Sequence, residues 1–276
     1  MKKILALLSM LLVSAPVLAQ PVVASSGTSL PPIPFTLHSE STSPLAIIQA
    51  NCYGCAGYAG LIASGYITKI TSQWTVPTVT CQPGLTDEQE LGFEVGLGGV
   101  DSATTYSTGV VIEALIYCSE GSSTPYSYTM VFYESAVTGS ATVWTLPFVL
   151  TSGHKLSVTI TLTPSTGKMT ATLKDATDGQ SMSFTTLMSY WGVVYNYVNQ
   201  AVWGVYREGS DLATFNPSIK FTKCDVVVSG ATHPISWISN LYELTMVDNS
   251  GTVTQATVSA LNGAGTGFSV KFVGST

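Results

Sequence analysis

Charged side chains are scarce in this sequence: they make up 9% of its 276 residues, against about 25% in an average soluble protein. A chain with few carboxylates loses little stability when they are protonated, and it gains little positive charge in acid. The composition therefore fits an acidic environment outside the cell, although an uncharged, Thr- and Ser-rich surface at neutral pH is the alternative interpretation. Basic clusters are absent as well, so we expect no binding to nucleic acid.

Histidines are few and the usual catalytic motifs are missing. The chain has no Gly-x-Ser-x-Gly motif, no phosphate-binding loop and no Asp-x-Asp-Gly calcium loop. Its histidines, His38, His154 and His233, stand in a linker, in a turn and before a proline, where the ring is usually only solvated. We therefore expect neither a Ser-His-Asp triad nor a metal site, and no cofactor.

Only the N-terminus is apolar enough to enter a membrane. Lys2 and Lys3 precede an apolar run at residues 4–12, and residues 17–19 (Val-Leu-Ala) offer a cleavage site. Residues 1–19 therefore predict a secretory signal peptide, which is too short to span a bilayer stably. Its removal takes away two of the 10 basic residues and leaves 8 against 16 acidic ones, a net charge of −8. We expect a secreted monomer without membrane contact after cleavage.

The rest of the chain divides into a linker and one domain. Residues 20–50 are rich in Pro, Ser and Thr without hydrophobic periodicity, which predicts an extended linker or a propeptide. A single domain is expected over residues 51–276. Hydrophobic residues make up 45% of the chain, which is enough to bury a sizeable core.

Five cysteines lie in this domain, and export permits disulfides. Cys52 and Cys55 can close a tight loop, and Cys81 can pair with Cys118. Because five is odd, at least one cysteine stays free or pairs between chains. The Cys-x-x-Cys spacing also occurs in redox and zinc sites, but no helix pattern follows it and no second pair exists, so a structural bridge is favoured.

Short strand-like runs alternate with turn residues from Tyr58 onward. Residues 155–163 alternate almost strictly between apolar and polar side chains. Only residues 256–261 indicate a helix. The spacing of about a dozen strands predicts an all-β fold: a two-sheet antiparallel β-sandwich, concanavalin-like or jelly-roll-like, with a concave groove. The expected strands include residues 61–75, 74–79, 94–99, 110–117, 126–134, 155–163, 169–174, 182–187, 200–207, 219–228, 242–247 and 267–273.

An ordered set of motifs resembles the secreted glutamic peptidases, or eqolisins. The likeness runs from about Tyr58 to Val273. The resemblance implies a curved sandwich with a substrate groove on its concave face. There a Glu acts as general base on a water, and a Gln amide helps to hold the oxyanion. The motifs are Gln-Trp-Thr-Val-Pro-Thr-Val at 73–79, Val-Gly-Leu-Gly-Gly at 95–99, Thr-Gly-Val at 108–110, Leu-Lys-Asp-Ala-Thr-Asp-Gly-Gln at 173–180, Gln-Ala-Val-Trp-Gly-Val-Tyr at 200–206, Phe215 and Phe221-Thr222.

The sequence departs from the family pattern at both catalytic positions. Ser107 stands where the family Gln precedes Thr-Gly, and Tyr206 stands at the place of the catalytic Glu. A phenol with an ordinary pKa near ~10 cannot act as a base in acid. Other carboxylates are candidates to replace the missing catalytic glutamate. Strand alternation directs them to the groove, or they lie near it. The alternative for each of them is a position on the surface. These candidates are Glu94, which stands at a family Trp position, Glu113, Glu134 and Glu208.

Three functions remain open at this point. The first is a non-proteolytic relative that binds a peptide or glycan in its groove. The second is an acid endopeptidase with Glu94 or Glu208 as base and Ser107 as oxyanion donor. The third is a structural cell-surface protein. For the first, aromatic side chains would line the groove unless they pack in the core: Trp74, Tyr106, Tyr126, Tyr128, Trp203 and Tyr206.

Overall fold

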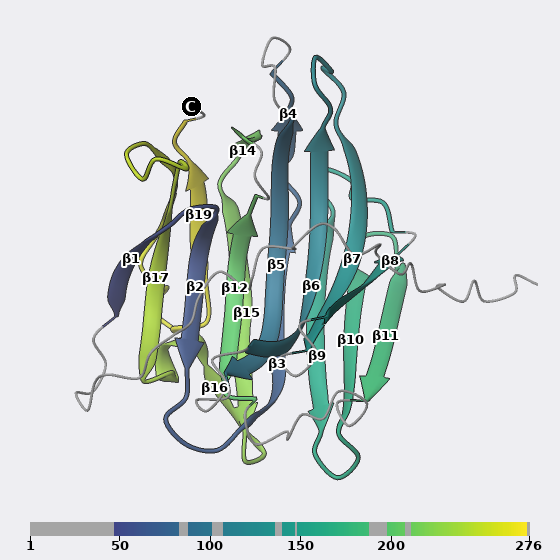
Figure 1. Cartoon of the computed structure of the whole chain (residues 1–276), viewed down its shortest axis with the longest axis vertical. Helices are drawn as coiled ribbons and strands as arrows, with labels where there is room; N and C mark the ends of the chain where they lie inside the picture. The colour runs from purple at the N-terminus through teal and green to yellow at the C-terminus, as the bar shows by residue number, and fades with distance from the viewer. Residues whose placement is uncertain are drawn as a thin grey trace, which may run out of the picture.

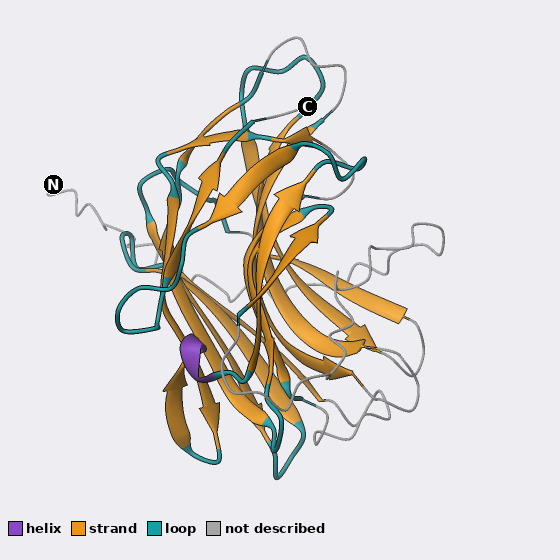
Figure 2. Cartoon of the chain, turned by 90° about the vertical axis from the view of Figure 1, so that its left-hand side faces the viewer, coloured by secondary structure: helices purple, strands orange, loops and turns teal. Residues whose placement is uncertain are grey.

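The computed structural model describes residues 47–82, 88–100, 107–135, 140–146, 148–187, 198–207 and 211–274. The expected signal peptide, most of the linker, Tyr106 and Glu208 lie outside these ranges. Within them the secondary structure is β-strand, apart from one 3₁₀ turn, η3 (Ile235–Trp237), as Figure 2 shows. No helix in the described ranges is long and apolar enough to cross a membrane.

The long strand β5 (Gln89–Val100) is central to the first layer of the fold (Figure 1). Strand β6 (Ser107–Cys118) pairs with one edge of β5, and β12 (Gln200–Tyr206) pairs with the other. Both pairings are antiparallel and in register over most of β5. The layer continues outward through β7 (Tyr126–Ser135) and β8 (Ser140–Leu146) on one side, and through β2 (Cys55–Leu61), β17 (Asn240–Val247) and the parallel β1 (Ile48–Cys52) on the other.

The second layer is organised around β3 (Ile67–Thr75), which pairs with β9 and β15. Strand β15 also pairs with β19, and β19 joins β17 through β18, so hydrogen bonds link the described strands of both layers into one curled sheet. Short β4 and β14 form a separate pair. The remaining bounds are β4 (Thr78–Thr80), β9 (Lys155–Thr163), β10 (Lys168–Asp175), β11 (Ser181–Leu187), β13 (Asp211–Leu212), β14 (Thr214–Asn216), β15 (Ile219–Val228), β16 (Ala231–Pro234), β18 (Thr254–Val258) and β19 (Phe268–Phe272).

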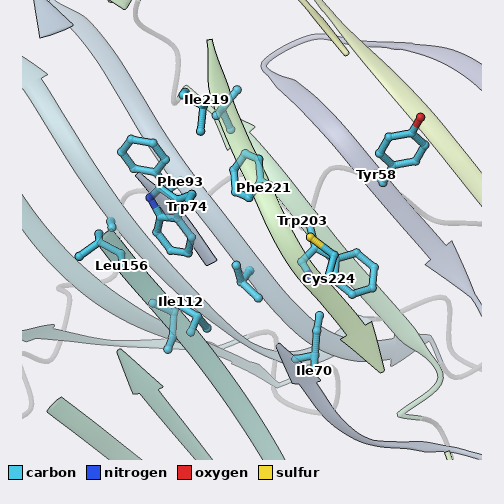
Figure 3. Packing of buried hydrophobic residues seen from close by; sticks show 14 of the residues in the cluster. Tyr58, Ile70, Trp74, Phe93, Ile112, Leu156, Trp203, Ile219, Phe221 and Cys224 are labelled. Atoms are coloured by element: carbon cyan, nitrogen blue, oxygen red, sulfur yellow. The ribbon is translucent and has the colours of Figure 1, made fainter. Parts of the chain in front are cut away.

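The core lies between the two layers and is filled by inward-facing residues of strands such as β5, β9 and β10. In β9 the side chains alternate between buried and partly exposed, as its sequence predicts. Trp74 of β3 stacks on Phe93 of β5 with 5.6 Å between ring centroids, which joins the layers. Figure 3 shows these rings together with Phe221 and Trp203.

The structure confirms the all-β prediction and corrects some of its elements. Residues 155–163 and 219–228 are strands with the expected bounds. The helix expected at residues 256–261 is wrong, because this segment continues strand β18 into an irregular stretch. The strand expected at 74–79 is divided at Pro77 between β3 and β4, since proline has no N–H for a ladder.

Two disulfides form as the spacing suggested. Cys52 bonds to Cys55, and Cys81 bonds to Cys118. Cys224 is a free thiol, and burial raises its pKa to about 12. Strand β1 begins at Ile48, three residues before residue 51.

Candidate functional site

Strand alternation gives the β5–β6–β12 part of the sheet two different faces. Leu91, Phe93 and Val95 point into the core between the layers, where they are fully buried. Gly92 and Glu94 therefore lie on the opposite face. We call the surface formed there by Gly92, Glu94, Glu113 and Tyr206 the site face.

Two glutamates stand side by side on the site face. The β5–β6 register pairs Glu94 directly with Glu113. Side chains directly opposite each other in an antiparallel pair have Cβ atoms about 4.5–5.5 Å apart. On the other side of Glu94 the partner in β12 is Gly204, which has no side chain. The register thus places two glutamate residues beside each other in a sequence where carboxylates are few.

The two carboxyl groups have different environments. Glu94 is 4% exposed, and this burial raises its pKa to about 7. Glu113 is partly exposed and accepts a hydrogen bond at 2.6 Å from the Tyr206 hydroxyl to its Oε2 atom. Below pH 7 Glu94 therefore keeps its proton, while Glu113 has a phenol O–H positioned to stabilise a carboxylate. An acid and a base can coexist at this point of the sheet.

Gly92 allows Tyr206 to reach Glu113. Tyr206 pairs with Gly92, and its ring crosses β5 toward β6. A Cβ atom on Gly92 would lie 2.3 Å from Cε1 of the Tyr206 ring, far inside van der Waals contact. Glycine is therefore required here for close approach rather than for a special backbone conformation.

Replacing Gly92 with alanine should destabilise the protein by about 1–3 kcal/mol, because the new methyl group overpacks against the Tyr206 ring. Urea unfolding measures this change. The matched control is the same substitution in a Tyr206→Ala background, where it should cost less than about 0.5 kcal/mol. Equal costs in both backgrounds would contradict the contact.

The structure does not bring Ser107 and Tyr206 together. Ser107 pairs with Val100 at one end of β5, whereas Tyr206 pairs with Gly92, eight positions away. At about 3.3 Å per residue, the two lie roughly 26 Å apart along the sheet. Glu113, which alternation placed on the same face as Ser107, is the residue of β6 that contacts Tyr206.

The tryptophans expected in the groove lie in the core. Trp203 has no exposed surface, and its Nε1 atom donates a hydrogen bond to the Thr71 carbonyl at 2.9 Å. Trp74 is 3% exposed and packs against aromatic rings of both layers. Neither ring therefore presents a surface to a ligand. Tyr106 and Glu208 lie outside the described residues, and of Ser107, Tyr128 and Glu134 only the backbone pairing is described.

One other cluster contains possible metal ligands. Atoms of His154, Asp175 and Asp178 lie within 4.8 Å of one another near the β10–β11 turn. His154 Nδ1 is 2.6 Å from Asp175 Oδ2, and the backbone N–H groups of Thr177 and Asp178 donate to Oδ1. Burial opposes ionisation of Asp175, but these hydrogen bonds outweigh it and lower the pKa. The cluster is therefore explained by the closing of this turn.

Comparisons with solved structures find the same fold among peptidases. Scytalido-glutamic peptidase, solved with a transition state analog inhibitor, is 16% identical with a TM-score of 0.58, covering 80% of this chain and 98% of that chain. SCP-B, a member of the eqolisin family solved with the tripeptide Ala-Ile-His, is 17% identical with a TM-score of 0.50, covering 79% and 98%.

A search of curated proteins finds no match. A family model, that of the peptidase A4 family, matches residues 55–266, which is most of the chain and nearly the whole of the described sandwich. The expected resemblance is thus confirmed at the level of the family, and the chain belongs to the peptidase A4 family, that of the glutamic peptidases.

Proposed function

We propose that this protein is an acid endopeptidase in which Glu94 and Glu113 replace the usual catalytic pair of its family. The observation that carries the proposal is the direct pairing of the two glutamates across β5 and β6, with the Tyr206 hydroxyl bound to Glu113. The family membership supports a polypeptide substrate.

Glu113 acts as the general base and Glu94 as the general acid. Glu113 takes a proton from a water molecule, whose oxygen attacks the carbonyl carbon of the peptide bond while Glu94 donates its proton to the carbonyl oxygen. The tetrahedral diol then collapses: Glu113 gives its proton to the leaving nitrogen, the C–N bond breaks, and Glu94 recovers a proton from the diol. Both glutamates end in their starting states, and one water is consumed.

This division of roles works in acid. A carboxyl group with a pKa of about 7 stays protonated at lower pH and serves as a proton donor. Activity should fall as the pH rises through about 7, because Glu94 then loses its proton. The Tyr206 hydroxyl has a positioning role, since its hydrogen bond holds the carboxylate of Glu113 in place.

The rival functions have less support. For a ligand-binding relative, tryptophan rings were expected in the groove, but Trp74 and Trp203 are buried in the core. A purely structural protein gives no reason to hold the buried Glu94 beside Glu113. The proposal also includes export before activity, since two disulfides suit an oxidising compartment.

The test is cleavage of an acid-denatured protein substrate from about pH 2 to pH 8 by the purified chain, with and without residues 20–46. Glu94→Gln and Glu113→Gln should each lower kcat/KM by about 10²-fold or more. Glu120→Gln, an exposed glutamate in the β6–β7 turn, is the matched control and should leave activity unchanged. Glu208→Gln tests the alternative base.

Two outcomes would reject the proposal. One is the absence of cleavage at every pH by both forms of the wild-type chain. The other is cleavage that survives in Glu94→Gln or Glu113→Gln. If activity were then lost only in Glu208→Gln, Glu208 would be the general base.

A further inference from the structure

A pair of tyrosines lies on the site face beyond the two glutamates. Tyr117 of β6 and Tyr126 of β7 pair directly, with 5.2 Å between their ring centroids. Tyr126 is 49% exposed, an unusual position for a large ring on a strand of this protein. The Tyr117 hydroxyl donates a hydrogen bond to the exposed carboxylate of Glu88, which fixes the orientation of the first ring.

Strand β6 carries both Tyr117 and Glu113, the catalytic base that we propose. Glu113, Leu115 and Tyr117 alternate on β6 and therefore share the site face. Leu115 is fully buried in the apolar cluster that also contains Tyr206. Glu113 and Tyr117 therefore flank a buried leucine on one face of β6.

The spacing corresponds to a short stretch of extended peptide. Four residues of strand separate Glu113 from Tyr117, which is about 13 Å. An extended peptide advances about 3.3–3.6 Å per residue, so a bond held at Glu113 leaves a side chain about four positions away near the tyrosines.

We propose that Tyr117 and Tyr126 form a substrate subsite that takes an aromatic or large aliphatic side chain about four residues from the cleaved bond. This inference rests on the proposed peptidase function and names its substrate preference. The two rings, of which Tyr126 is exposed, offer apolar area with little loss of conformational freedom. The nearby carboxylate of Glu88 disfavours an acidic side chain at the same place.

The experiment uses synthetic nonapeptides of Ala, Gly and Ser with blocked ends, in which one Phe is moved through every position. Cleavage is followed at pH 4, and mass spectrometry locates the cleaved bond. Phe placed three to five residues from that bond should raise kcat/KM about tenfold over the peptide without Phe. Tyr126→Ala should reduce this preference to less than twofold.

Tyr126→Phe is the matched control, because it keeps the ring and should keep the preference. A Phe preference that persists in Tyr126→Ala, or its absence in the wild type, would overturn the subsite while leaving the peptidase function intact. If no peptide is cleaved, calorimetric titration with the same peptides measures their binding and tests the subsite directly. Tighter binding of the Phe peptides to the wild type but not to Tyr126→Ala would support the subsite without the peptidase function, and equal binding would reject both.

Discussion

Glu94→Gln should stabilise the protein at pH 8. The unfolding free energy that the substitution adds should be about 3 kcal/mol larger at pH 8 than at pH 4. Burial raises the pKa of Glu94 from 4.5 to about 7, and each pKa unit corresponds to about 1.36 kcal/mol. The folded wild type must hold a buried carboxylate at pH 8, whereas a glutamine amide of nearly the same shape stays neutral at any pH.

The raised pKa of Glu94 determines how its contribution to stability changes with pH. A carboxyl group with a raised pKa contributes its full stability below pH 4.5, where it is protonated in both the folded and the unfolded chain. That contribution is lost as the pH rises through about 7. Glu94 pairs directly with Glu113 of β6 and with Gly204 of β12, and the Tyr206 hydroxyl, which binds Glu113, is a second titratable group on this face.

Urea unfolding at pH 4, 6 and 8 measures this effect for the wild type, Glu94→Gln and the exposed control Glu120→Gln. Asp175 and Asp248 have lowered pKa values, so their protonation changes the stability only below about pH 4, outside the range of this measurement. If the difference in unfolding free energy between the wild type and Glu94→Gln stayed constant across this range, the pKa of Glu94 would not be raised by folding.

Gly57→Ala should destabilise the fold by about 3 kcal/mol or more, enough to prevent purification of a folded chain. Gly57 of β2 pairs with Gly204 of β12 where the two backbones approach closely. A Cβ atom on Gly57 would lie 2.1 Å from the Trp203 carbonyl oxygen and 2.6 Å from the Gly204 Cα atom. Because these are backbone atoms, only separation of the strands would relieve the overlap.

Gly263→Ala is the control for this prediction, since nothing lies within 4 Å of a Cβ atom built there. Its unfolding free energy should stay within about 0.5 kcal/mol of the wild type. Circular dichroism and urea unfolding of the two variants give the comparison. A stable Gly57→Ala protein would mean that the two strands do not approach as described.

The fold was predictable from local patterns to a large extent. Alternation in residues 155–163 gives both the strand and its buried face, because each strand packs against one core. The end of the chain was harder: residues 256–261 contain alanine and leucine at spacings that suit a helix, but pairing with β17 and β19 makes the segment start as a strand. Tertiary pairing outweighs such a weak local preference.

The site was less predictable, because it depends on register between strands distant in sequence. Alternation places Glu113 on the same face as Ser107, but only the β5–β6 register places it opposite Glu94. One error was avoidable. Trp203 and Tyr206 are three residues apart in one strand, so they must point to opposite faces, and both cannot line one groove.

Cys224 also affects the covalent integrity of the chain. Thiol–disulfide exchange requires a thiolate, and a thiol with a pKa of about 12 is ionised in roughly one molecule in 10⁵ at neutral pH. The buried sulfur therefore cannot attack either bridge of its own chain, nor join two copies, while the sandwich is folded. An odd cysteine, usually a hazard outside the cell, becomes reactive only when the core opens.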